Sequence, residues 1–139
     1  MPDQSPERTK FLEAVAIQAD YWAQSLSERL TQPGSDLSVL SARGSAERVR
    51  ASLVEGEVEG SAVRDVLAAV TNGLSVSILT AIDEGTPQLG APPLRLVDPS
   101  GGSLGPLHEA FVAHLIDTGR MPLPDIEWGT DEPPDRSDH

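Results

Sequence analysis

The sequence predicts a mainly α-helical domain, and three observations carry that prediction. Apolar residues repeat at intervals of three and four along residues 6–30 and again along residues 61–82. Serine, proline and glycine stand where such helices would begin and end. The 139 residues have the length of a single globular domain, and 38% of them are apolar. We therefore expect a compact domain of three to four helices over residues 1–128, followed by a flexible acidic tail over residues 129–139.

The first helix is predicted from Pro6 to about Leu30. Proline is favoured at the first helical position, and Gln32-Pro33-Gly34 ends the pattern. The helical projection gathers the apolar residues into one stripe, which places Trp22 in the core and Tyr21 at the edge, within reach of water. The stripe consists of Phe11, Leu12, Val15, Ala19, Trp22, Ala23, Leu26 and Leu30.

The second helix is predicted to begin at Ser45, a favourable N-cap residue, and to end before Gly56. The preceding connector, residues 35–44, has room for one helical turn at Leu37–Leu40. The following segment, residues 55–60, alternates glutamate with glycine and valine, so we expect an exposed acidic loop.

The third apolar segment runs from Ser61 to Ile82 and has two interpretations. A single long helix is favoured, because only Asn72-Gly73 interrupts the pattern and Asp83-Glu84-Gly85 resembles a helix end. The alternative is an α+β fold with a buried strand at residues 75–82, because serine alternates there with apolar residues. In the helical interpretation, the other helices pack around this segment.

Two elements are predicted after the proline-rich residues 86–93. Residues 94–97 form at most a small β element, closed by a turn at residues 98–102. The last helix is predicted from Pro106 to about Thr118.

His108 and His114 of this last helix resemble a zinc-binding pair only superficially. Metal-binding histidines on a helix are four residues apart, whereas these are six apart and would project about 120° from each other. Val112 stands where the second ligand would be. Residues 101–105 are rich in glycine but lack the lysine of a phosphate-binding loop. We expect neither a metal nor a cofactor.

His108 lies near the centre of the apolar arc of the last helix, so we expect its ring to point inward and to find a hydrogen-bonding partner. A functional alternative pairs His108 with Asp83 or Glu84 in a small cleft, where an imidazole beside a carboxylate could act as a base. Asp83 and Glu84 also stand out because acids at a helix C-terminus oppose the helix dipole.

The formal net charge is −12, of which −5 falls in residues 125–139. This charge repels nucleic acids and anionic membranes and favours a basic protein partner. The chain has no cysteine, and its N-terminal residues do not resemble a signal peptide. The apolar windows are shorter than a membrane-spanning helix requires. We expect a cytoplasmic protein of bacterial type.

Two functions follow from these features. The first is a non-enzymatic protein-binding module, comparable by charge and size with immunity proteins, antitoxins and inhibitors. Tyr21 and Trp128 are candidate partner-binding residues, because exposed aromatic side chains anchor interfaces. The second is a small enzyme or ligand-binding domain that uses a cleft at His108. The sequence leaves the oligomeric state open.

Overall fold

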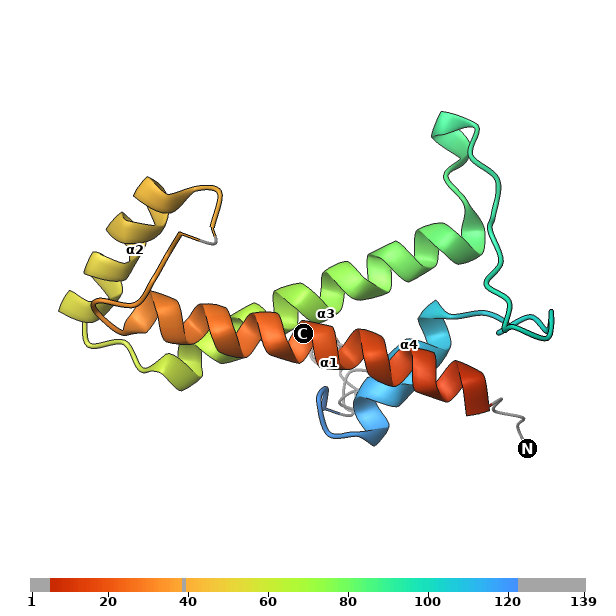
Figure 1. Cartoon of the computed structure of the whole chain (residues 1–139), viewed down its shortest axis with the longest axis horizontal. Coiled ribbons are helices and arrows are strands. Elements are labelled where there is room, and N and C mark those ends of the chain that lie inside the picture. The colour runs from red at the N-terminus through yellow and green to blue at the C-terminus, as the bar shows by residue number, and fades with distance from the viewer. Residues whose placement is uncertain (1–5, 39, 123–139) are drawn as a thin grey trace, which may run out of the picture.

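The computed structural model describes residues 6–38 and 40–122, and these residues are mainly helical as predicted. They form four α-helices: α1 (Pro6–Thr31), α2 (Arg43–Glu55), α3 (Gly60–Glu84) and α4 (His108–Asp117). The two long helices α1 and α3 run in opposite directions and cross each other (Figure 1). Helix α2 packs at one end of α1, and α4 packs against both α1 and α3.

Helix α1 begins at Pro6 and ends at Thr31, close to the predicted bounds. Its buried residues follow the three- and four-residue spacing that lets one side of a helix face its neighbours. One member of the predicted stripe is misplaced: Trp22 is 46% exposed, so its assignment to the core was wrong. The buried residues are Leu12, Ala16, Ala19, Ala23 and Ser27.

Helix α2 begins at Arg43, two residues before the predicted Ser45, and no side chain caps its N-terminus. None of its residues is buried. The Arg50 guanidinium connects it to the preceding segment by donating to the carbonyl oxygens of Ser35 at 2.7 Å and Arg29 at 3.4 Å. Leu37 is buried in this connector, and its carbonyl oxygen accepts a hydrogen bond from the backbone nitrogen of Leu40 at 3.0 Å.

Helix α3 is continuous from Gly60 to Glu84, so the alternative strand at residues 75–82 is wrong. Hydroxyl groups explain how polar residues fit this helix. Ser75 and Thr80 donate to the backbone oxygens four residues earlier, each at 2.8 Å. These bonds satisfy the hydroxyls within the helix, and the alternation of serine with apolar residues therefore does not require a strand.

The segment between α3 and α4 contains one short 3-10 helix, Pro87–Leu89, and forms no strand. Two isolated antiparallel bridges, Thr86 with Ala91 and Val97 with Ser103, are its β-like features. The Asp98 carboxylate accepts hydrogen bonds from the backbone of Ser100 and Gly102, which closes the turn predicted at residues 98–102.

The core lies where α1, α3 and α4 meet. Helix α3 contributes only Leu79 to its buried apolar cluster, and most of the α3 surface is exposed. The expectation that the other helices would enclose residues 61–82 was therefore wrong. The buried apolar cluster consists of Leu12, Ala16, Leu79, Leu104, Leu107, Phe111 and Leu115.

Candidate functional site

The carboxylate of Asp83 joins the C-terminus of α3 to the N-terminus of α4. Its Oδ2 atom accepts hydrogen bonds from the backbone nitrogens of Leu107 and His108, each at 2.7 Å. The first amide groups of a helix have no partner within the helix, and Leu107 at the N-cap position of α4 provides no side-chain cap. Asp83 therefore caps α4 from a different helix, 24 residues earlier in the chain.

His108 binds the same oxygen through its side chain. Its Nδ1 atom lies 2.6 Å from Asp83 Oδ2, and its Nε2 atom lies 3.7 Å from Glu84 Oε2. The hydrogen bond that the His108 ring donates to Asp83 raises the pKa of His108 above 6.5 and outweighs the opposite effect of burial. Burial by itself would raise the pKa of Asp83, but the bonds from His108 and Leu107 lower it overall. Both shifts favour an ion pair.

The structure thus brings together His108, Asp83 and Glu84, the three residues considered as a catalytic site. The side chains of His108 and Asp83 are 22% and 10% exposed, and Glu84 is 62% exposed. The large cavity between α1 and α3 is lined by other residues. We assign Asp83 and His108 a structural role, because their contacts link two helices and cap one of them.

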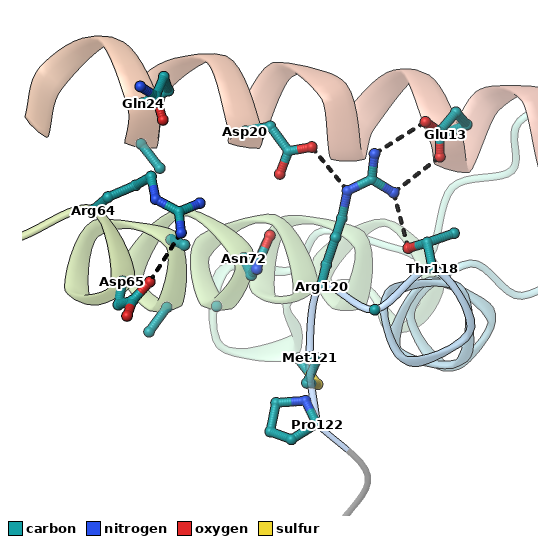
Figure 2. Close-up of a pocket in the computed structure, with 15 residues that line it drawn as sticks. Glu13, Asp20, Gln24, Arg64, Asp65, Asn72, Thr118, Arg120, Met121 and Pro122 are labelled. Carbon is teal, nitrogen blue, oxygen red and sulfur yellow. Dashed lines mark hydrogen bonds and ion pairs between the residues drawn. The ribbon is translucent and has the colours of Figure 1, made fainter. Parts of the chain in front are cut away.

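A second charged cluster lies where α1 meets the C-terminus of α4, and the sequence analysis missed it. Figure 2 shows the Arg120 guanidinium between Glu13 and Asp20, two acids of α1. Two Arg120 nitrogens bind the two Glu13 oxygens at 3.0 Å each, and a third binds Asp20 at 2.8 Å. His114 Nε2 lies 2.6 Å from Glu13 Oε1. The histidines of α4 thus bind different acids on different helices.

These contacts stabilise the charged form of Glu13. Hydrogen bonds from Arg120 and then His114 lower the pKa of Glu13 to about 2. Two parallel hydrogen bonds fix an arginine more firmly than a single contact does. The cluster therefore ties the chain after α4 to α1. Glu13 and Arg120 are 107 residues apart in the sequence, and no local sequence pattern indicates that they meet.

A cavity of about 910 Å³ lies beside this cluster, between α1, α3 and the segment that follows α4. Its walls include Arg120, Met121 and Pro122 on one side and residues of α3, among them Asn72, on another (Figure 2). Asn72 is 6% exposed, and its Oδ1 atom is buried without a hydrogen-bond partner. This unpaired acceptor is a local weakness in the packing of α1 against α3.

The most unusual surface of the described residues is an apolar ridge on α3, here called the α3 face: Val66, Val70, Leu74 and Ile78. Their exposed fractions are 65%, 58%, 60% and 52%. A spacing of four residues places them along one side of the helix. No charged residue occurs between Asp65 and Asp83. Large apolar side chains that gather on one uncharged surface indicate an interaction site.

Helix α3 is also long and apolar enough to cross a membrane, judged by length and composition alone. This corrects the expectation that every apolar window is too short. The core helix of a soluble protein can have the same length and composition. Here only 11% of the apolar window is buried. The finding that matters for function is that this helix lacks a partner over much of its surface.

The two candidate partner-binding aromatics have different outcomes. Tyr21 is 56% exposed and packs edge-on against Trp22, with ring centroids 6.0 Å apart. Trp128 and the predicted tail lie outside the described residues. No protein-family model, curated protein or solved structure matches this chain.

Proposed function

We propose that this chain is a non-enzymatic protein-binding module that associates with protein chains through the α3 face. The observation that carries the proposal is the exposure of four neighbouring aliphatic side chains on an uncharged helix surface. Such a module belongs to the same broad functional class as immunity proteins, antitoxins and inhibitors. These act by covering a surface of another protein.

Burial of the α3 face would supply the driving force for association. A fully buried valine, leucine or isoleucine contributes roughly 1.5–3 kcal/mol relative to full exposure, so each half-exposed side chain retains roughly half of that. Leu74 lies near the middle of the ridge, where interface energy is usually concentrated. The absence of charge is equally favourable, because charged groups are depleted at the centres of protein interfaces.

The acidic residues around the α3 face would attract a partner of opposite charge. With a net charge of −12, the protein would attract a basic partner and accelerate its approach. Asp65 lies beside the ridge, and three further acids before α3 are exposed: Glu55 at the end of α2, and Glu57 and Glu59 in the loop that follows. We propose that a basic heterologous partner, where one exists, contacts these acids at the rim while the apolar centre excludes water.

The alternative function, an enzyme or ligand-binding domain at His108, has less support. One oxygen of Asp83 already accepts three hydrogen bonds from α4. The Asp83–His108 pair is therefore engaged in connecting helices, and a general base needs a free position within reach of a substrate proton.

Photo-crosslinking tests the proposal. A photoreactive amino acid replaces Leu74 in the full chain, and the matched control carries it at Ser52, which is exposed on α2. We expect adducts with a protein chain from position 74 and far fewer from position 52. Adding Val70→Asp should abolish the adducts, because it introduces a charge into the ridge. Position 74 giving no more adducts than position 52 would refute the proposed function.

A further inference from the structure

We infer that the α3 face is covered by the α3 face of a second copy of this chain, so that two α1–α3 pairs form a dimer. This inference rests on the proposed function and names the partner. Four properties of the molecule bear on it: the regular spacing of the ridge, the side of the α1–α3 pair that α4 leaves uncovered, the net charge of the chain, and the exposed apolar area.

The ridge is suited to pairing with itself. Val66, Val70, Leu74 and Ile78 form one row of residues four apart, and rows of this kind interlock when two helices cross. A two-fold axis beside Leu74 would place the two Leu74 side chains together. It would also place Val70 of each copy near Ile78 of the second copy. In such an interface the same surface serves both molecules.

Helix α4 covers one side of the α1–α3 pair and leaves the other side open. On α3, Asp83 faces α4 through His108, and Leu74 projects about 180° from Asp83 at 100° per residue. On α1, Asp20 binds Arg120 beyond the end of α4, and Trp22 projects about 160° from Asp20 by the same rule. Leu74 and Trp22 therefore both lie on the side away from α4.

The net charge of the chain limits where two copies can meet. Two chains that each carry −12 repel each other, so they can only meet through a surface that adds no further repulsion. The α3 face meets this condition. Asp83, the acid at its C-terminal end, is turned toward α4 and is only 10% exposed.

The exposed area is of the right order for a dimer. Four half-exposed aliphatic side chains present about 400 Å², and Trp22 adds about 100 Å². Two copies would then bury roughly 1,000 Å² from these residues alone. The small residues beside the ridge add to this area and bring the sum toward the roughly 1,200–2,000 Å² of stable interfaces.

Two other occupants fit the structure less well. Residues 123–139 leave the described chain from Pro122, which lines the cavity beside Asn72. Asn72 projects about 160° from both Val70 and Leu74 on α3, so Pro122 lies on the opposite side of the helix from the α3 face. A membrane would have to accept α3 together with Asp65 and Glu84 at its ends, both acidic. An inserted α3 would also lose its bond from Thr71 to Ala19 of α1.

Sedimentation and cysteine crosslinking test the dimer. The full chain has a mass of 14.7 kDa, and we expect twice this mass at micromolar concentration. Leu74→Asp should raise the dissociation constant by about 30-fold or more, because it places two charges at the centre of the interface. The matched control is Leu89→Asp, which alters an 80% exposed leucine outside the α3 face and should remain dimeric. Circular dichroism establishes that both variants are folded.

The second measurement exploits the absence of cysteine in this chain. Leu74→Cys should form an intermolecular disulfide under mild oxidation within minutes, and Leu89→Cys should not. A monomer at every concentration, together with no disulfide, would overturn the dimer. If photo-crosslinking at position 74 then still captures another protein, the proposed function stands without the dimer. Flotation with phosphatidylcholine vesicles that Leu74→Asp abolishes would also overturn the dimer, in favour of a membrane. A dimer that forms only after residues 123–139 are deleted would overturn it in favour of the C-terminal segment.

Discussion

Asp83 and His108 meet through a single carboxylate oxygen that binds both the backbone and the ring of the histidine. The three hydrogen bonds at Asp83 Oδ2, of 2.6–2.7 Å, come from the first residues of α4. Two of the seven residues in the buried apolar cluster, Phe111 and Leu115, lie in α4, and Leu104 and Leu107 lie just before it. This one contact therefore positions much of the core. The acid that opposes the dipole of α3 thereby stabilises the positive N-terminus of α4.

Asp83→Ala should destabilise the fold by about 1–3 kcal/mol, because it removes the cap of α4 and leaves two backbone amides without an acceptor. Urea denaturation followed by circular dichroism measures the change. The matched control is Glu84→Ala at the neighbouring position, where the side chain is 62% exposed, and its effect should be within about 0.5 kcal/mol. Equal effects of the two substitutions would contradict the capping role.

The contribution of the ion pair should depend on pH. The pKa of Asp83 is lowered in the folded protein, so its contribution to stability is present above pH 3.8 and is lost as the pH falls through the lower pKa of the folded state. His108 has a raised pKa, so its contribution is present below 6.5 and is lost as pH rises through the higher folded value. The stability difference between the wild type and His108→Gln should be largest between pH 4 and pH 6.5 and should shrink above that range. A stability difference that stays constant from pH 5 to pH 9 would contradict the role of the ion pair.

Arg120→Lys should lower stability by about 1 kcal/mol, because a lysine cannot bind both oxygens of Glu13 in parallel. The effect is moderate since Glu13 is 39% exposed and water screens the pair. Arg64→Lys is the matched control, since Arg64 contacts only the adjacent Asp65 among the ion pairs of the described chain. Thermal unfolding of both variants at neutral pH provides the comparison.

Glu13 should also govern part of the acid sensitivity. Its pKa is lowered from 4.5 to about 2, so its contribution to stability is present above pH 4.5 and is lost as pH falls toward 2. Glu13→Gln should therefore destabilise the protein at pH 6 and have little effect near pH 2. If Glu13→Gln destabilised the protein equally near pH 2, the loss of stability would come from packing and not from charge.

Gly85→Ala should be more destabilising than Gly90→Ala, although both glycines have positive φ angles, +75° and +70°. A Cβ atom at Gly90 would meet nothing within 4 Å. Gly90→Ala should therefore lower the free energy of unfolding by only about 1–2 kcal/mol, which is the cost of the left-handed backbone conformation. At Gly85 the same atom would lie 2.6 Å from the Ala91 oxygen, which forces the chain after α3 to move. Urea midpoints of the two variants decide whether this close approach matters.

Periodicity and end signals in the sequence were sufficient to predict the helices. Helix α1 lies within one residue of its predicted bounds, because Pro6 and Gly34 are strong start and stop signals. The start of α2 was misplaced because its N-cap residue, Ala42, has no capping side chain to mark it. Trp22 was misplaced for a different reason. It fits the apolar stripe, but no element packs over that side of α1 closely enough to bury it.

The contacts of the candidate site were also predicted only in part. The proximity of His108 to Asp83 or Glu84 could be considered from the sequence, since an inward-pointing histidine needs a partner and two acids at a helix end need compensation. The contact between Glu13 and Arg120 could not be predicted, because neither Glu13 in α1 nor Arg120 in the segment after α4 is unusual in its local sequence. Only the packing of α4 against α1 brings them together.

The sequence by itself favoured a helix over residues 61–82, without charge from Val66 to Ile82, in a chain that is strongly acidic. Only the tertiary structure decided which side of that helix is buried. The physical reason is that α3 is apolar around most of its circumference, so its helical projection has no unique inner side. The ten residues of α4 cover one side, next to Asp83, and leave Leu74 and its neighbours exposed on the other.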